Sequence, residues 1–436
     1  MTPVDADIVQ KKVRECGLEE VGKSSIREMV RLVNDIEKES NTKFFRMEMG
    51  VPGLPSTRIG IDAEIDALNK GVSSIYPPIE GIAALKLETS RFLKLFADAE
   101  FNPIGCLPTV GSMEASIASM MVINRLNPAK NKTLYIDPGF PVHKVQAKAL
   151  GLPFESFDIY NYRGSKLKAK LESYFQQGNI STLLYSNPNN PSWVCLTDNE
   201  LRCIGELSEK YNVIVLEDLA YFGMDFRKNI GIPGEPPFQP TVRKYTDNCI
   251  LMLSGSKMFS YAGQRIGLLA ISDSLFYRKS DNLKPFFGSD EFGHAIIYGS
   301  LYSLTAGTAH SAQHAMAAML KAANNGQFNF VEENREYGKR AQIMKKLFLD
   351  NGFYLVYDKD EDDPVADGFY FTINYPGFTG GQLMEELLYY GISAVTLDIT
   401  GSEKEGLRAC VSQFKIDQAD ELNRRLRLFK EHHPIN

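Results

Sequence analysis

The chain has 436 residues, of which 44% are hydrophobic and 23% are charged. Its 48 Lys and Arg residues against 54 Asp and Glu residues give a formal net charge of −6. This mild acidity argues against binding to nucleic acids or anionic membranes, because both require clustered positive charge. No stretch approaches the roughly 20 apolar residues of a membrane helix. The composition is that of a folded protein long enough for two or three domains.

The first fifty residues are mostly helical and charged in pattern. They lack the charged start, apolar run and small-residue cleavage site of a signal peptide. The six cysteines are scattered without a CxxC pair, which favours reduced core residues over a disulfide framework. We therefore expect a cytoplasmic protein.

Between about residues 105 and 275, short apolar runs alternate with amphipathic segments. Several runs are apolar throughout, as expected of strands that are covered on both faces. Helical patterns separate most of them, for instance residues 200–207, for which Thr197 is the expected cap. The pattern predicts an α/β domain with a mainly parallel sheet. The five runs are 133–137, 182–186, 213–218, 250–254 and 266–271.

The C-terminal part of the chain has a different pattern, which predicts a smaller α+β domain. We expect a large domain over residues 60–315, and a small domain that both termini form from residues 1–59 and 316–436. The acidic stretch Asp358–Asp363 is expected to be a solvated loop. The expected helices are 309–323, 330–349, 379–390 and 419–431, and the expected strands are 353–357 and 368–374.

Functional side chains in an open parallel sheet collect beyond the carboxyl ends of the strands. One expected strand ends at Ser254, and Lys257 follows it in the sequence Ser-Gly-Ser-Lys. A lysine in this position is partly desolvated and can act as an amine nucleophile toward an aldehyde. A surface lysine in a Ser/Gly turn is the alternative interpretation.

Asp218 follows another all-apolar run. Burial of a carboxylate there is costly unless the carboxylate is paired. It is either a cap for the next segment or the anion that keeps a pyridine nitrogen protonated. The preceding run leads into Asn187-Pro188-Asn189-Asn190-Pro191, which is a typical turn sequence but lies one strand before Asp218.

Two further loops offer contacts for a cofactor. Gly111, Ser112 and Met113 open a helix whose free N–H groups and dipole suit a phosphate, although simple helix capping explains such a sequence equally well. Phe140 lies in a constrained loop after the run 133–137. It could stack on a flat ring or be an ordinary core residue.

Together these residues resemble one family. The ordered set Asn-Pro-x-Asn-Pro, Asp-x-x-Tyr and Ser-x-Ser-Lys, with Arg265 eight residues after Lys257, is similar to fold-type I pyridoxal-phosphate enzymes of the class I/II aminotransferase family. The resemblance extends from about Gly50 to Arg408. It implies an aspartate-aminotransferase-like fold, with a large domain that binds pyridoxal 5′-phosphate and a smaller α+β domain.

The resemblance also implies roles at the cofactor. Lys257 is expected to bind the cofactor aldehyde covalently and to move a proton at the α-carbon as general base and acid. Asp218 is expected to pair with the pyridine nitrogen, and Asn190 and Tyr221 to hydrogen-bond the ring hydroxyl. The remaining cofactor contacts are expected from Phe140 on the ring face, and from Gly111, Ser112, Met113, Ser254 and Arg265 at the phosphate.

Three positions are implied at the substrate and the subunit interface. Arg408 matches the arginine that forks the substrate α-carboxylate, with a surface salt bridge as the alternative. Gly50 matches the loop that closes over the same group, where Asn190 is a further expected contact. Tyr76 matches the tyrosine that reaches the phosphate in the neighbouring subunit, so the resemblance implies a homodimer.

Several features depart from the family pattern or fall outside it. Ser192-Trp193 replaces the usual Thr-Gly, so either the loop has a different shape or the indole narrows the pocket. No second arginine is evident for a dicarboxylate, and the aromatic loop 284–288 with Tyr298 favours an uncharged or aromatic substrate side chain. His310 and His314 lie four residues apart but lack a third ligand, so we expect no metal site.

The expected function is a pyridoxal-phosphate-dependent aminotransferase that moves an amino group between an α-amino acid and a 2-oxo acid. A lyase or decarboxylase of the same fold is the alternative, since the cofactor supplies the electron sink and the pocket selects the bond that breaks. A non-catalytic regulator is disfavoured because the N-terminal fifty residues leave no room for a basic DNA-binding domain. A generic α/β binding protein does not explain why Lys257, Asp218 and Asn190 coincide.

Overall fold

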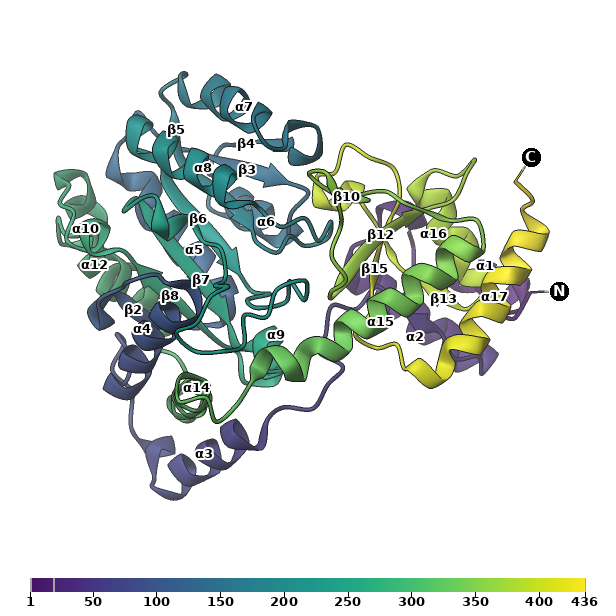
Figure 1. Ribbon diagram of the computed structural model, residues 1–436, viewed down its shortest axis with the longest axis horizontal. Coiled ribbons are helices and arrows are strands. Elements are labelled where there is room, and N and C mark those ends of the chain that lie inside the picture. The colour runs from purple at the N-terminus through teal and green to yellow at the C-terminus, as the bar shows by residue number, and fades with distance from the viewer. Residues whose placement is uncertain (1, 19, 436) are drawn as a thin grey trace.

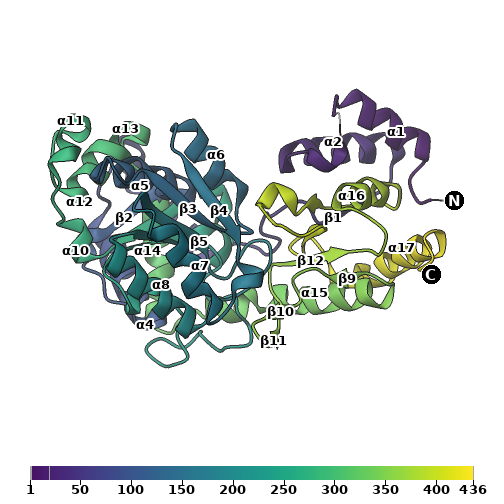
Figure 2. The same cartoon turned by 90° about the horizontal axis from the view of Figure 1, so that it is seen from above.

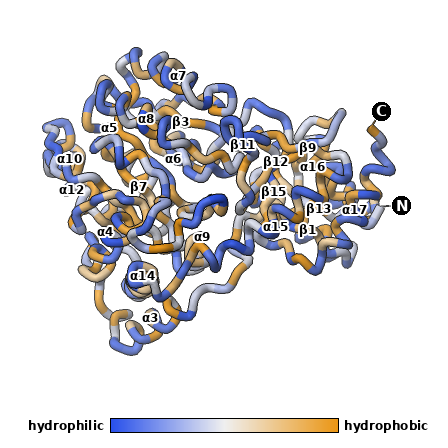
Figure 3. Tube along the Cα trace, viewed as in Figure 1, coloured by the Kyte–Doolittle hydropathy of each residue, from blue (hydrophilic) through white to orange (hydrophobic). Residues whose placement is uncertain are grey.

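The computed structural model describes residues 2–18 and 20–435. It has a larger and a smaller region, and both termini lie in the smaller one (Figure 1). Helix α15 (Phe330–Asp350) starts at the larger region and runs along the smaller one. Hydrophobic segments pass through the centre of both regions (Figure 3).

A seven-stranded sheet forms the centre of the larger region, in the order β2-β8-β7-β6-β5-β3-β4. Strand β8 runs antiparallel to its neighbours β2 and β7, and the other pairings are parallel, which confirms the predicted mainly parallel sheet. The strands are β2 (Cys106–Val110), β3 (Lys132–Asp137), β4 (Phe154–Asp158), β5 (Ile180–Ser186), β6 (Ile214–Leu219), β7 (Cys249–Ser254) and β8 (Ile266–Ile271).

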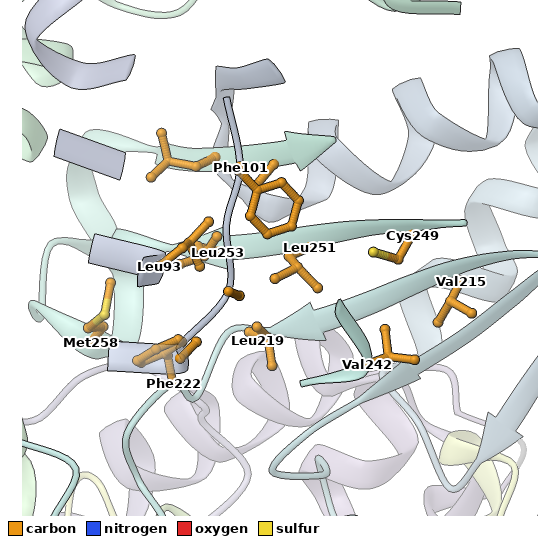
Figure 4. Packing of buried hydrophobic residues seen from close by; sticks show 14 of the residues in the cluster. Leu93, Phe101, Val215, Leu219, Phe222, Val242, Cys249, Leu251, Leu253 and Met258 are labelled. Atoms are coloured by element: carbon orange, nitrogen blue, oxygen red, sulfur yellow. The ribbon is translucent and has the colours of Figure 1, made fainter. Parts of the chain in front are cut away.

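Both faces of this sheet are buried. On β7, Leu251 and Leu253 pack into one hydrophobic cluster (Figure 4), whereas Ile250 and Met252 pack into another on the opposite face. This explains why the central strands are apolar throughout instead of alternating. The two strands that the sequence did not reveal, β2 and β4, lie at the two edges of the sheet, where a proline and polar residues are tolerated.

Helices surround this sheet, and α8 shows the predicted capping: the Thr197 hydroxyl accepts a hydrogen bond from Glu200 N, and the Glu200 carboxylate accepts one from Thr197 N. The helices of the larger region are α3 (Arg58–Asn69), α4 (Ala83–Ala97), α5 (Gly111–Leu126), α6 (Pro141–Ala149), α7 (Lys166–Phe175), α8 (Asp198–Tyr211), α9 (Gly255–Met258), α10 (Asp273–Phe276), α11 (Lys284–Phe287), α12 (Phe292–His294), α13 (Tyr302–Thr305) and α14 (His310–Asn324).

The smaller region contains a four-stranded antiparallel sheet, in the order β14-β15-β12-β9. Strand β1 from the N-terminal part pairs with β13, and α1 and α2 lie over α16 (Figure 2). The elements are α1 (Ala6–Glu15), α2 (Ile26–Ser40), β1 (Phe45–Arg46), β9 (Tyr354–Leu355), β12 (Tyr370–Asn374), α16 (Gly380–Tyr389), β13 (Ile392–Ser393), β14 (Val395–Thr396), β15 (Leu407–Cys410) and α17 (Ala419–His432).

The predicted domain boundaries remain predictions, and the packing bears on one of them. Helix α14 packs on α3 and α4, and its buried residues from Ala312 to Ala323 belong to a hydrophobic cluster of the larger region. The expected boundary at 315/316 falls inside this helix. We therefore propose that the boundary lies in the connection between α14 and α15.

The acidic stretch forms a hairpin of β10 (Lys359–Asp360) and β11 (Asp363–Pro364), and Asp360 is not solvated as predicted. Its carboxylate is buried and lies 2.8 Å from Arg163 Nη1 and 2.7 Å from Arg227 Nη2. Both arginines belong to the larger region. The expectation of a solvated loop is wrong at this residue because its ion pairs with the two arginines connect the hairpin to the larger region.

A second group of hydrogen bonds connects the two regions near the loop of Phe140. The buried Asp158 carboxylate, at the end of β4, accepts hydrogen bonds from the Tyr357 hydroxyl and from Glu403 N at 3.1 Å. Gly139 N donates to Thr400 O at 2.8 Å.

None of the helices in residues 2–18 and 20–435 is long and apolar enough to cross a membrane.

Candidate active site

Lys257 lies in the short helix α9, directly after strand β7. The Ser254 hydroxyl starts this helix by accepting a hydrogen bond from Ser256 N at 3.2 Å. The Lys257 ammonium donates to Gly50 O and lies 4.9 Å from the centre of the Phe369 ring. Burial lowers the pKa of Lys257 to about 8, and the charges of Arg408 and Arg265 act in the same direction. The amine is thus easier to deprotonate than an exposed lysine.

Asp218 lies on the neighbouring strand β6 and is buried. It accepts a hydrogen bond from Ala220 N at 3.0 Å, and His143 Nε2 lies 3.8 Å from its carboxylate. Burial raises the pKa of Asp218 to about 7 and lowers the pKa of His143 to about 4. His143 is therefore neutral near neutral pH, and among the described residues no lysine or arginine pairs with Asp218.

The turn after β5 leaves one amide group unused. Asn189 builds the turn, since its Nδ2 donates to Pro138 O at 2.8 Å and its Oδ1 accepts from the Ser192 hydroxyl at 2.7 Å. Asn190 is held by a bond of 3.2 Å from its backbone N–H to the Ser186 hydroxyl. Its side-chain Oδ1 is buried and has no hydrogen-bond partner in residues 2–18 and 20–435. The sheet register brings this turn beside Asp218, because Ser186 is opposite Asp218.

Gly111, Ser254 and Arg265 lie at the same edge of the sheet. Val110 pairs with Ile266 and Ser254 pairs with Gly267, so the residues next to these positions are neighbours. Gly111 has a φ of +67°, and a Cβ on it would lie 2.6 Å from Arg265 Nη2. The exposed arginine therefore borders the start of α5, where Ser112 and Met113 are partly buried. A helix start with a neighbouring guanidinium suits an anion.

Glu114, which the sequence analysis did not single out, also holds the start of this helix. Its carboxylate accepts hydrogen bonds from Val110 N at 2.6 Å and from the Thr305 hydroxyl at 2.7 Å. Burial raises its pKa. Phe140, in the next loop, is partly buried and packs edge-on against His143 with ring centres 5.6 Å apart.

Three aromatic residues lie together behind Lys257. The Tyr221 hydroxyl donates to the Tyr370 hydroxyl at 3.0 Å, and both side chains are buried. Trp193 is completely buried, with ring centres 5.2 Å from Tyr221 and 6.2 Å from Tyr370. Its φ of +62° shows that the loop takes a left-handed turn at this residue. The indole thus packs behind Tyr221 within the hydrophobic cluster of the smaller region.

Arg408 is only 1% exposed, which excludes the surface salt bridge. Its Nη2 donates to Glu48 O at 2.8 Å, and its guanidinium carbon lies 4.7 Å from the centre of the Tyr370 ring. Its Nε is buried without a partner in the described residues. A buried guanidinium that pairs with no carboxylate of the described residues favours binding of an anion. Gly50 lies close by, since the Glu48–Gly50 segment contacts both Arg408 and Lys257.

Tyr76 lies away from the other predicted site residues. Its side chain is 91% exposed, and the neighbouring Ile75 is 59% exposed. The structure therefore does not bring Tyr76 to Lys257 within one chain. His310 holds the same loop, with its Nδ1 3.1 Å from Ile75 O, and stacks on His314 at 5.4 Å. In the part of the chain that the structure describes, no group of three His, Cys, Asp or Glu side chains could hold a metal ion.

Besides Glu114, sequence reasoning missed four residues at this site: His143, Tyr337, Phe369 and Tyr370. Tyr337 is fully buried, and its hydroxyl accepts from Gly53 N at 3.0 Å and Leu54 N at 3.2 Å, which fixes the chain beyond Gly50. Aromatic residues inside a helix or strand have the same pattern as core residues. Only the tertiary structure shows that these side chains lie beside Lys257, Asp218 or the segment that starts at Gly50.

A family model described as aminotransferase class I and II matches residues 52–426. A probable aspartate aminotransferase of Methanocaldococcus jannaschii is 25% identical over 252 residues, which are 58% of this chain and 61% of that protein. An S-alkyl-thiohydroximate lyase of Arabidopsis thaliana is 24% identical over 56% of this chain and 51% of that protein. The matches thus span between half and two thirds of the length of these curated relatives.

Solved structures support the same fold. An aspartate aminotransferase double mutant of Thermus thermophilus superposes with a TM-score of 0.74, covering 96% of this chain and 98% of that chain at 14% identity. A Mycobacterium tuberculosis aminotransferase superposes with a TM-score of 0.75, covering 94% of this chain and 96% of that chain at 14% identity. At such identities the likeness concerns the fold, and it confirms the predicted aspartate-aminotransferase-like architecture.

Proposed function

The chain belongs to the aminotransferase class I and II family, and we propose that it transfers an amino group between an α-amino acid and a 2-oxo acid with pyridoxal phosphate as cofactor. The observation that carries the proposal is the position of Lys257 and Asp218 at the ends of the neighbouring strands β7 and β6. The lysine has a lowered pKa, and the buried carboxylate has no cationic partner among the described residues. A protonated pyridine nitrogen is the cation that this site lacks.

The unused bonding groups around Lys257 fit this cofactor. Asp218 can accept a pyridinium N–H, and the Asn190 amide has a buried oxygen without a partner in the described residues. An amide in this state can present either its oxygen or its N–H₂ group, so it suits a ring oxygen. The start of α5 at Gly111, with Arg265 beside it, suits a phosphate. The residues present thus match the ring nitrogen, ring oxygen and phosphate of the cofactor.

Bound pyridoxal phosphate supplies an electron sink that acidifies the α-hydrogen of an amino acid. We propose that Lys257 binds the cofactor aldehyde covalently, because its lowered pKa increases the fraction of free amine. With a substrate bound, the free Lys257 amine would hold and move the proton at the α-carbon as general base and acid. Phe140 is proposed to cover the ring face, and Tyr221 to accept a hydrogen bond from the ring hydroxyl, since its own proton is donated to Tyr370. Ser112, Met113 and Ser254 complete the proposed phosphate contacts.

We assign the substrate carboxylate to Arg408. Its buried position and unpartnered Nε support this role, since a guanidinium and a carboxylate form two parallel hydrogen bonds. Gly50 lies between Arg408 and Lys257, so its loop and Asn190 are proposed to border the same group. Fixing the carboxylate holds the α-carbon in place for proton transfer by Lys257.

We further propose a homodimer in the cytoplasm. Four apolar side chains are exposed together on α3 and the following loop: Ile65 at 49%, Leu68 at 45%, Ile75 at 59% and Tyr76 at 91%. Clustered exposed apolar residues are typical of an interface. Burial against a second copy would bring Tyr76 to the phosphate of the other active site. The six cysteines are free, as is usual in a reducing compartment.

The test is an assay of purified, cofactor-loaded protein with a panel of amino donors, scored for new amino acid formed from 2-oxoglutarate or pyruvate. We expect transfer with at least one donor, and borohydride reduction should link the cofactor to Lys257 in a peptide map. Sedimentation should give the mass of a dimer, and Tyr76→Ala should lower the cofactor affinity.

The same assay distinguishes amino transfer from a lyase or decarboxylase reaction. The name of one relative also raises the possibility of a lyase. Release of ammonia or carbon dioxide without any need for an oxo acid would contradict the proposed transfer. A chain that binds no pyridoxal phosphate would contradict the whole assignment.

A further inference from the structure

Tyr370 is the second member of a buried pair of phenols next to Lys257. It belongs to β12, where it pairs with Cys410 of β15, and its side chain is 2% exposed. Its ring faces the Arg408 guanidinium at 4.7 Å, and its hydroxyl accepts a hydrogen bond from Tyr221 at 3.0 Å. Neither the family motifs nor the sequence analysis assigns this residue a role.

One hydrogen atom of this pair has no acceptor. Two phenols carry two O–H donors, and a single hydrogen bond between them uses one of these donors. In the described residues, the bond to Tyr221 is the one hydrogen bond of the Tyr370 hydroxyl. Burial raises the pKa of Tyr370 to about 12, so the hydroxyl keeps its proton near neutral pH. A buried donor without an acceptor is unfavourable and indicates a missing partner.

The hydroxyl points to the place where the proposed substrate carboxylate belongs. A Cβ built on Gly50 would lie 2.3 Å from the Tyr370 oxygen, so the hydroxyl lies directly against this glycine. The Gly50 carbonyl accepts from Lys257, and Arg408 is bonded to Glu48 O, two residues earlier. The hydroxyl therefore lies against the Glu48–Gly50 segment, which is bonded to both the amine and the guanidinium.

We propose that the Tyr370 hydroxyl donates a hydrogen bond to the substrate carboxylate that Arg408 holds, and is thus a second binding residue for this group. The inference rests on the proposed function, because it takes the carboxylate site at Arg408 as given. Tyr221 keeps its donated bond to Tyr370 and can still accept a hydrogen bond from the cofactor, so the two phenols link the two sites. A carboxylate bound in this way accepts from one charged and one neutral donor.

A purely structural role is the competing explanation, since Tyr370 also packs against Trp193 and covers Arg408. Tyr370→Phe separates the two roles because it keeps the ring and removes only the hydroxyl. Tyr375→Phe is the matched control: this buried tyrosine follows β12, but its hydroxyl donates to His433 O at 2.6 Å, at the C-terminal end of the chain.

The experiment measures the binding of pyruvate to the cofactor-loaded protein. Pyruvate has the smallest side chain of the 2-oxo acids, so the preference of the side-chain pocket does not determine the result. The fluorescence of Trp193, the single tryptophan of the chain, reports binding independently of turnover. We expect Tyr370→Phe to raise the dissociation constant of pyruvate about ten-fold, as the loss of one hydrogen bond to a charged group predicts. Tyr375→Phe should leave it unchanged.

One further variant completes the design. Arg408→Gln should weaken pyruvate binding by more than Tyr370→Phe. Equal pyruvate affinity in Tyr370→Phe and wild type, with a loss in Arg408→Gln, would overturn this inference alone. A wild-type protein that fails to bind pyridoxal phosphate, or an Arg408→Gln variant without effect, would instead overturn the proposed function.

Discussion

Two lysines of the larger region, Lys86 and Lys257, both have their pKa lowered to about 8 by burial. Lys86 donates to three backbone carbonyl oxygens at 3.0, 3.0 and 3.1 Å, so each of its N–H bonds has an acceptor. Among the residues that the structure describes, Lys257 has one acceptor, the Gly50 carbonyl, and its ammonium lies over the Phe369 ring. The same shift in pKa therefore occurs in Lys86, whose N–H bonds all have acceptors, and in Lys257, whose amine can still form further hydrogen bonds.

Adjacent carboxylates on β6 differ in what surrounds them. Burial raises the pKa of both Glu217 and Asp218 to about 7. Glu217 Oε2 accepts from the Thr241 hydroxyl at 2.6 Å and Val242 N at 3.0 Å, and so holds a neighbouring loop, while its Oε1 is buried without a partner in the described residues. Asp218 accepts from one backbone N–H and lies at the strand end beside the turn of Asn190. An unused bonding group therefore indicates reactivity only where it lies at the site, and burial alone does not.

The largest expected effect is the loss of activity in Lys257→Ala. Removal of the group that binds the cofactor and carries the proton should lower kcat by at least about a thousand-fold. Lys86→Met should leave kcat within about three-fold, since a saturated lysine takes no part in chemistry. Single-turnover kinetics with an amino donor measure both. Full turnover in Lys257→Ala would contradict the catalytic role proposed for Lys257.

The carboxylate pair should show the next largest effect. Asp218→Asn removes the anion that balances a pyridinium, so kcat should fall about a hundred-fold or more and cofactor affinity should fall with it. Glu217→Gln keeps an acceptor for the Thr241 hydroxyl and should leave kcat within about three-fold. Steady-state rates and cofactor titrations give both values. Equal losses in the two variants would show that burial alone decides the role.

Lys86, which we expect to have little effect on kcat, should instead affect the stability of the fold. Lys86→Met leaves three carbonyl oxygens without their donor and should lower the free energy of unfolding by about 2 kcal/mol. Urea unfolding measures this change, and Lys346→Met, on the exposed surface of α15, is the control with a change of at most about 0.5 kcal/mol. Unchanged stability in Lys86→Met would contradict the structural role of Lys86.

The smallest effect concerns the pH dependence of stability. The pKa of Glu217 is raised from 4.5 to about 7 in the folded chain. Between these values the folded chain binds more protons than the unfolded chain, so this residue makes stability fall as pH rises. Relative to Glu217→Gln, the wild type should lose at most about 1.4 kcal/mol per pH unit across this window. Unfolding titrations at several pH values test this, and a parallel pH profile for both proteins would contradict it.

Much of the fold could be predicted because its signals are local. The central strands are apolar throughout, and the capping pair Thr197 and Glu200 marks a helix start. The ends of the strands then indicated the neighbourhood of Lys257 and Asp218. The edge strands β2 and β4 were missed, since strands at an edge tolerate proline and polar residues and so lose the apolar pattern.

The rest of the site depends on contacts between distant segments. Tyr337 and Tyr370 reach Gly53 and Tyr221 from a helix and a strand of the C-terminal part, and their sequence pattern equals that of core residues. Asp360 looked like one of several solvated acids, because the two arginines that bind it are more than 130 positions away in sequence. Tyr76 shows the opposite limit: its proposed partner is a second molecule.

The contacts between the two regions have a mechanical consequence. Asp360 binds two arginines, and Asp158 with Gly139 holds the segment around Thr400. The Tyr221–Tyr370 hydrogen bond and the packing of Trp193 on Tyr370 join the same regions at a third place. Contacts at three separate places resist both rotation and separation of the smaller region. They therefore hold Arg408 and Tyr370 in one position relative to Lys257.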